Sequence, residues 1–139
     1  MKRIIIASHG KLAKGMQDTL NLFTGDGDEL DIITAYEEGN ESVETQIDRV
    51  FSKINEQDEA LIFTDLFGGS VNQKIILKAI NKKNVYIIAG FNLPIILEAI
   101  TTNQPLTDET VNQLVEKGKL NLQLVNTSQI KDINDDFFD

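Results

Sequence analysis

A chain of 139 residues without cysteine is long enough to bury one hydrophobic core, and it excludes disulfide frameworks, thiolate nucleophiles and cysteine-ligated metal sites. Its formal net charge of -9 disfavours binding to nucleic acid or anionic membranes and favours basic protein partners. No stretch reaches the roughly 20 apolar residues of a membrane span, and no cleavage-type segment follows the apolar run at 4–7, so we expect a cytoplasmic protein.

Four short apolar runs rich in β-branched residues predict buried strands, and they alternate with helical patterns. The predicted strands cover residues 3–7, 31–35, 60–64 and 85–89, and the first helical patterns cover residues 12–23 and 43–54. Ser42 is placed as the N-cap of the second helix. This order predicts an α/β fold with an open, doubly wound, mostly parallel sheet and helices on both faces. Such folds place ligand chemistry at the carboxyl ends of the strands.

Three further elements are predicted after the fourth strand. Pro94 suits the first turn of a helix that runs to about residue 101. Thr107 is placed to cap another helix, which Gly118 is expected to end. Alternating leucines predict a late fifth strand over 120–125, at an edge of the sheet. The expected organisation is one domain over residues 1–127 and an acidic tail without firm structure over residues 128–139.

The only histidine, His9, follows the first predicted strand at the edge of the sheet where these folds have their sites. Gly10 after it lets another backbone approach closely. Asp65 closes the third strand, and its carboxylate reaches His9 if the two strands are neighbours. A carboxylate on one ring nitrogen fixes the tautomer and leaves the other nitrogen free to attack phosphorus. The alternative is that Asp65 merely caps its own turn.

The turn formed by Gly68, Gly69 and Ser70 is expected to open the next helix. Helix N-terminal N–H groups and the helix dipole favour anions, so these three residues are candidates to bind a phosphoryl group. An ordinary N-cap at Ser70 is the alternative. Phe67 and Phe91, on loops at the same end of the sheet, are candidate apolar anchors for a partner, although burial beneath the loops is favoured.

Several other site classes are disfavoured by missing motifs. Neither a G-x-x-x-x-G-K-[ST] loop nor a G-x-G-x-x-G turn is present, and a hydrolase using Ser8 or Ser70 lacks the G-x-S-x-G elbow. One histidine cannot make a multi-histidine metal site, so we predict no metal or other cofactor. A solvated turn, rather than a calcium loop, is expected from the acidic cluster of Asp26, Asp28, Glu29 and Asp31.

Three blocks of sequence carry a further signal. They are Ile-Ile-Ile-Ala-Ser-His-Gly at 4–10, continued by Leu-Ala-Lys-Gly-Met at 12–16, Thr-Asp-Leu-Phe-Gly-Gly-Ser at 64–70 and Ala-Gly-Phe-Asn-Leu-Pro at 89–94. Together they resemble the IIA component of the mannose-family sugar phosphotransferase systems (PTS), over the chain to about residue 125.

The resemblance implies a phosphotransferase component in which the phosphocarrier protein HPr phosphorylates His9 and Asp65 orients the ring. Transfer then continues to a histidine of the IIB component, and on to a sugar that enters through the membrane-embedded IIC and IID components. The family resemblance also implies a homodimer whose late antiparallel strand is exchanged between subunits. Residues 120–125 stand where that strand should be.

Two features depart from the family pattern. Leu66 stands where some relatives have a hydroxyl residue, so more of the phosphoryl binding is expected to fall to Ser70 and backbone N–H groups. No IIB domain follows, so IIB is expected to be a separate protein. Two other functions stay open: a phosphoryl donor domain for a dihydroxyacetone kinase, and a regulatory module that binds an anion without phosphorylation of His9.

Overall fold

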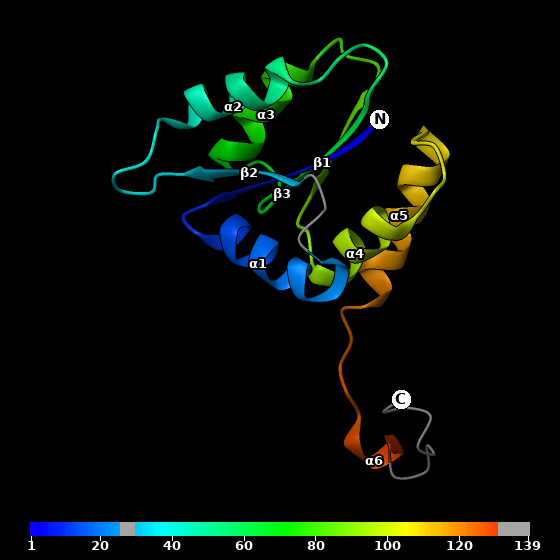
Figure 1. The fold of residues 1–139 in the computed structure, drawn as a ribbon. Coiled ribbons are helices and arrows are strands. Elements are labelled where there is room, and N and C mark those ends of the chain that lie inside the picture. The colour runs from blue at the N-terminus through cyan, green and yellow to red at the C-terminus, as the bar shows by residue number, and fades with distance from the viewer. Residues whose placement is uncertain (26–29, 131–139) are drawn as a thin grey trace.

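The computed structural model describes residues 1–25 and 30–130. Four parallel strands form one sheet in the order β2-β1-β3-β4 (Figure 1). The strands are β1 (Lys2–His9), β2 (Leu30–Ala35), β3 (Glu59–Thr64) and β4 (Val85–Ala89). Each contains one of the predicted apolar runs, so the predicted α/β class and the parallel sheet are confirmed.

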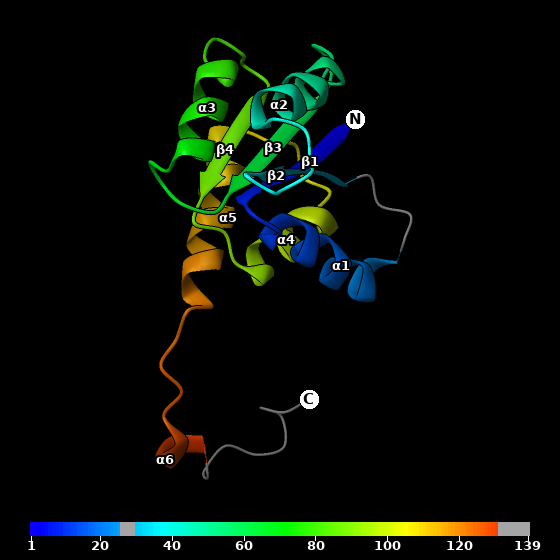
Figure 2. The same ribbon diagram turned by 90° about the vertical axis from the view of Figure 1, so that its left-hand side faces the viewer.

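Helices cover both faces of the sheet, with α1, α4 and α5 on one face and α2 and α3 on the other (Figures 1 and 2). Two predicted N-caps are confirmed, because the side chain of Ser42 accepts from the Thr45 N–H and that of Thr107 from the Thr110 N–H. The helices are α1 (Leu12–Thr24), α2 (Val43–Ser52), α3 (Ser70–Ala79), α4 (Leu93–Thr101), α5 (Asp108–Leu120) and α6 (Thr127–Ile130).

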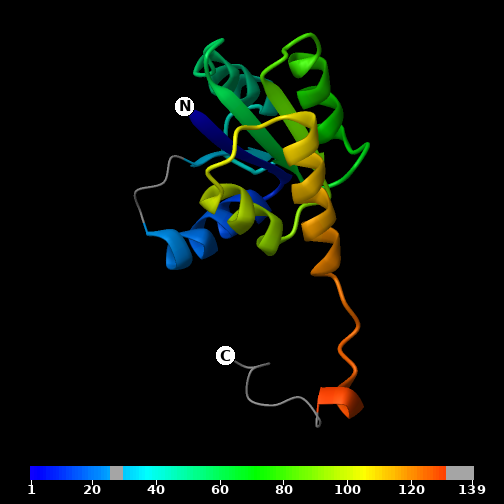
Figure 3. The same cartoon turned by 90° about the vertical axis from the view of Figure 1, so that its right-hand side faces the viewer.

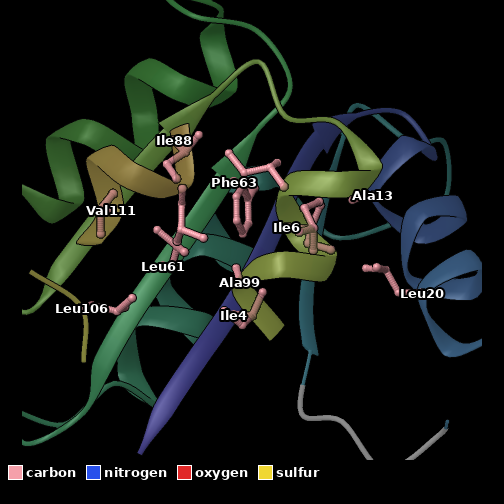
Figure 4. Packing of buried hydrophobic residues seen from close by; sticks show 13 residues of the cluster. Ile4, Ile6, Ala13, Leu20, Leu61, Phe63, Ile88, Ala99, Leu106 and Val111 are labelled. Carbon is pink, nitrogen blue, oxygen red and sulfur yellow. The ribbon is translucent and has the colours of Figure 1, made fainter. Parts of the chain in front are cut away.

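The sheet separates two hydrophobic cores. Because side chains alternate along a strand, Ile4 and Ile6 of β1 pack toward α1, α4 and α5, whereas Ile5 packs toward α2 and α3. Figure 4 shows Ile6 in the first core together with Phe63 from β3 and Ile88 from β4. Both faces of the central strands are buried, which is why they read as continuous apolar runs in the sequence.

Gly118 lies inside α5 and does not end it, so the predicted helix end is wrong. A Cβ atom at this position would lie 2.9 Å from Ile95 Cδ1, closer than packed atoms tolerate. The carbonyl of Gly118 also accepts a hydrogen bond of 2.9 Å from Asn92 Nδ2. The glycine therefore serves the close approach of α4 and α5, and the helix continues to Leu120.

The late strand predicted over 120–125 does not form within the described chain, where residues 121–126 have no regular structure. The segment leads away from its own sheet toward α6 (Figures 1 and 3). A strand needs a neighbour that pairs with its backbone, and none is within reach of this segment in the described residues. All three alternating leucines are exposed, Leu120 by 71%, Leu122 by 88% and Leu124 by 94%.

Two segments named in the sequence analysis lie partly or wholly outside the described residues. Asp26, Asp28 and Glu29 of the acidic cluster, and residues 131–139 of the tail, lie outside the described residues. Asp31 of the same cluster lies in β2 and accepts from Lys53 Nζ at 2.9 Å. None of the helices in residues 1–25 and 30–130 has the length and apolar character that a membrane crossing requires.

Candidate active site

The candidate site lies where β1 and β3 run side by side at the centre of the sheet. From β1 the chain crosses to β2 on one side, and from β2 it returns to β3 on the other. Such a point, where the strand order reverses, leaves a crevice at the carboxyl ends of the strands. His9 is the last residue of β1, and Asp65 directly follows β3.

The Asp65 carboxylate holds the His9 ring. Its Oδ2 accepts from the backbone N–H of His9 at 2.8 Å and from the ring Nδ1 at 2.9 Å. Its Oδ1 accepts from the Leu66 N–H at 2.9 Å, so Asp65 also caps its own turn. Because Nδ1 donates to the carboxylate, Nε2 is left with its lone pair available.

The electrostatics of the pair favour an ionised carboxylate. Burial by itself would raise the pKa of Asp65, but hydrogen bonds from the backbone and the ring of His9 outweigh it and hold this pKa below its ordinary value. The Asp65 side chain is only 11% exposed, whereas that of His9 is 38% exposed. The imidazole is thus open to a partner on one side and faces a carboxylate on the other.

Ser70 lies on the far side of the ring, with its Oγ 3.3 Å from His9 Nε2. The N-cap of α3 is Gly69, and Ser70 is the first helical residue. The alternative that Ser70 is an ordinary N-cap is therefore wrong. Because the first N–H groups of a helix have no intrahelical acceptor, the first turn of α3 brings anion-binding groups beside the free nitrogen of His9.

The two glycines shape this turn. Gly68 has φ +77°, a left-handed conformation that glycine adopts without strain. A Cβ atom on Gly69 would lie 3.2 Å from Leu66 Cβ and 3.5 Å from His9 Cε1. The N–H groups of Gly68 and Gly69 donate to Asn72 Oδ1 and to the Leu66 carbonyl. They are used within the turn, so Ser70 and the N–H groups after it are the better candidates to bind an anion.

Buried polar side chains hold the site in place. Ser8 Oγ accepts from the Ala13 N–H at 2.7 Å and so fixes the start of α1 beside His9. Asn72 Nδ2 donates to Thr64 Oγ1 at 2.9 Å, which ties α3 to the end of β3. Ser8 is fully buried, a position that does not suit the nucleophile of a hydrolase.

Phe67 and Phe91 differ in exposure. The Leu66 carbonyl accepts from the Gly69 N–H, and this turn leaves Phe67 at its tip, 87% exposed. The prediction that Phe67 is buried is therefore wrong. Phe91 is partly buried against the core beneath its loop, as expected. An exposed aromatic side chain next to the site is available for contact with a partner.

Sequence reasoning missed Tyr36, the residue directly after β2. Its ring centroid lies 5.6 Å from that of His9, and its hydroxyl donates to Ser70 Oγ at 2.8 Å. The available signal was its position, because β2 was predicted to be parallel to the other strands and its carboxyl end therefore lies at the same edge of the sheet.

Comparison with protein families and relatives gives a consistent result. The family model described as "PTS system fructose IIA component" matches residues 3–118. The chain is 23% identical over 140 residues to the PTS system fructose-specific EIIA component of Bacillus subtilis (strain 168), covering 98% of this chain and 96% of that protein. It is 26% identical over 121 residues to the PTS system mannose-specific EIIAB component of Escherichia coli (strain K12), covering 84% of this chain and 37% of that protein.

Solved structures share the fold. A PTS IIA protein associated with the fucose utilization operon of Streptococcus pneumoniae matches with a TM-score of 0.70 at 26% identity, over 92% of this chain and 94% of that one. The mannose/sorbose-specific IIA subunit of Enterococcus faecalis matches with a TM-score of 0.76 at 20% identity, over 91% and 96% of the two chains. At that identity the second match is evidence for the fold alone.

Proposed function

We propose, from the premise that this chain belongs to the family of PTS fructose IIA components, that His9 accepts a phosphoryl group from phosphorylated HPr and passes it to a separate IIB component. Family membership supports a phosphocarrier role in sugar uptake, a phosphotransferase-type activity. The observation that carries the residue assignment is the His9 ring, which is held at Nδ1 by Asp65 at 2.9 Å while Nε2 faces Ser70.

The proposed transfer is an in-line displacement between two imidazoles. The lone pair of His9 Nε2 attacks phosphorus, the P–N bond to the donor ring breaks, and the donor nitrogen takes back the electron pair. The Nδ1 proton stays on His9, because it is hydrogen-bonded to Asp65. The phosphorylated ring then carries a positive charge beside the carboxylate, which stabilises it.

The phosphoryl oxygens are proposed to bind at the start of α3. The Ser70 hydroxyl and the first-turn N–H groups of the helix supply donors, and the helix dipole favours the negative charge. The side chain of Leu66, which stands where some relatives have a hydroxyl residue, offers no donor, and its backbone N–H already donates to Asp65 Oδ1. The reaction as proposed needs no metal or nucleotide.

Docking of partners is proposed at the face around His9. Phe67 and Leu66 are exposed by 87% and 58% beside the ring and offer apolar contacts. The net charge of -9 favours encounters with partners that carry basic patches and makes them sensitive to salt. Two carriers must dock in turn, and an open site suits such brief encounters.

A homodimer is also part of the proposal. The segment 120–125 begins at the last residue of α5, and its alternating leucines are exposed. An unpaired strand exposes its backbone hydrogen-bonding groups in the same way, and pairing with another chain would satisfy them. β4 is the last strand in the order of the sheet, so its outer edge has no partner strand in the described residues, and a second copy is proposed to add this segment there. The boundary at residue 127 and the cytoplasmic location stay predictions.

The function is tested by following the phosphoryl group. The chain is incubated with phosphoenolpyruvate, the first enzyme of the PTS and HPr, and the product is then treated with acid or with base. We expect an acid-labile, base-stable phosphate, as for phosphohistidine, and its loss on addition of a IIB component. Transfer instead to a dihydroxyacetone kinase would support that alternative, and an unmodified chain beside phosphorylated HPr would favour the anion-binding module.

One observation favours a second candidate. Ser70 Oγ, the His9 ring and Asp65 lie in the order of a Ser-His-Asp hydrolase, with 3.3 Å and 2.9 Å between successive partners. A fluorophosphonate probe separates the two functions, because it labels Ser70 only if His9 activates its hydroxyl as a nucleophile. The carrier proposal predicts no labelling above that of a Ser70→Ala variant.

A further inference from the structure

Tyr36 reaches into the candidate site from the carboxyl end of β2. Its hydroxyl donates to Ser70 Oγ at 2.8 Å, and Ser70 Oγ lies 3.3 Å from His9 Nε2. The Tyr36 and His9 rings are tilted by 38° with 5.6 Å between centroids. A continuous row of polar atoms therefore runs from the phenol of Tyr36 through the serine to the nitrogen proposed to carry the phosphoryl group.

The loop that carries Tyr36 is fixed by two buried hydrogen bonds and one partly buried hydrogen bond. Gln46, only 2% exposed, accepts from the Thr34 N–H and donates to the Thr34 carbonyl, each at 2.9 Å. Asn40 Nδ2 donates to Thr34 Oγ1 at 2.8 Å. These contacts hold the residue two positions before Tyr36 and the loop after it, so the tyrosine projects from a rigid base.

The backbone of Tyr36 is unusual. In the described part of the chain, Tyr36 and Asn81 are the non-glycine residues with positive φ, at 62° and 74°. Asparagine tolerates this left-handed conformation, whereas an aromatic residue adopts it at an energetic cost. Tyr36 is also 61% exposed, so burial of its ring does not account for the cost. Strained residues of this kind concentrate at functional sites.

We propose that Tyr36 is a positioning residue that acts through Ser70: its hydroxyl directs the Ser70 hydroxyl at the phosphoryl group on His9. The inference rests on the proposed function. The phenol donates to Ser70 Oγ, so the serine hydrogen is free to point at Nε2 or, after transfer, at a phosphoryl oxygen. A hydroxyl that accepts one hydrogen bond becomes a stronger donor in the next, which is the gain that the tyrosine supplies.

The test is a double-mutant cycle on the rate of transfer from phosphorylated HPr. Tyr36→Phe keeps the ring and removes the hydroxyl, and it is expected to lower kcat by about threefold to tenfold, the usual effect of one hydrogen bond, with KM for HPr unchanged. The same change made in a Ser70→Ala chain is expected to have no further effect. Tyr86→Phe, which removes a phenol hydroxyl from β4 at a distance from the site, is the matched control.

Two outcomes would overturn the inference: parental kcat in Tyr36→Phe, or effects of the Tyr36 and Ser70 changes that simply multiply. A purely structural role would instead lower the midpoint of thermal unfolding, which is measured on the same samples. If the parent chain accepts no phosphoryl group, the proposed function fails. The positioning role is then judged by the ¹⁵N resonance of His9 Nε2. Tyr36→Phe should shift this resonance when Ser70 is present and should leave it unchanged in a Ser70→Ala chain.

Discussion

Asp65 Oδ2 accepts hydrogen bonds from both the backbone N–H and the ring Nδ1 of His9, at 2.8 and 2.9 Å. One carboxylate oxygen therefore fixes the position of the ring relative to its own backbone as well as its tautomer. Because Nδ1 is held in this way, Nε2 is the one ring nitrogen of His9 that the carboxylate leaves available.

An Asp65→Asn variant keeps the shape of this contact and removes the charge. We expect phosphoryl transfer to His9 to slow by about a hundredfold or more, as when the orienting carboxylate of a catalytic histidine is replaced by an amide. Rapid-quench kinetics with phosphorylated HPr measures the rate. Asp18→Asn, which removes an exposed carboxylate on α1, is the control and should behave as the parent. Equal rates in the two variants would show that Asp65 has no part in transfer.

Gly118→Ala tests the packing of α5 against α4. A Cβ atom there meets Ile95 Cδ1 at 2.9 Å, so we expect the free energy of unfolding to fall by about 1–3 kcal/mol, the usual cost of overpacking. Gly15→Ala in α1 meets nothing within 4 Å, and alanine is the better helix former, so this variant should gain about 0.5–1 kcal/mol. Urea unfolding of both variants measures the change in the free energy of unfolding, which should be negative for Gly118→Ala and positive for Gly15→Ala. A stabilising Gly118→Ala would contradict the close contact.

Acid should weaken the fold through Asp58. This carboxylate accepts from the Asn55 N–H at 2.9 Å and from Arg3 Nε at 3.1 Å, and these bonds hold the pKa of Asp58 below its ordinary value of 3.8. Because its pKa is lower in the folded chain, the stabilisation is complete above the unfolded pKa. It is lost as pH falls through the folded pKa.

Asp58→Asn is therefore expected to unfold at a lower temperature than the parent at about pH 7, and the difference should shrink as the pH is lowered to about 3, where the parent begins to lose the same interaction. Thermal unfolding followed by circular dichroism at both pH values measures this. A difference that stays constant with pH would mean that ionisation of Asp58 does not stabilise the fold.

The proposed dimer depends on the exposed leucines after α5. A double variant, Leu122→Glu with Leu124→Glu, places charges where the added strand should pack and is expected to be monomeric. Sedimentation equilibrium gives the mass in solution. Leu22→Glu, at a leucine of α1 that is 85% exposed, is the control and should remain dimeric. A parent chain that sediments as a monomer would contradict the dimer itself.

The strands could be predicted because each is a local run of apolar residues. The meeting of His9 with Asp65 could be predicted because the carboxyl ends of parallel strands lie at the same edge of a sheet. Gly118 was misjudged because the demand for a glycine comes from Ile95, a residue far away in sequence. The strand at 120–125 does not form because pairing needs an edge that this segment does not reach within the described residues. Tyr36 was missed because its backbone is left-handed, a conformation that a tyrosine in the sequence does not indicate. This conformation accompanies the hydrogen bond from its hydroxyl to Ser70.

The central claim is that His9 carries a phosphoryl group, and intact mass after incubation with phosphoenolpyruvate, the first enzyme of the PTS and HPr tests it most directly. The account predicts a gain of about 80 Da, one phosphoryl group, in the parent chain and none in His9→Gln. A parent chain of unchanged mass beside phosphorylated HPr, or a gain that persists in His9→Gln, would contradict it.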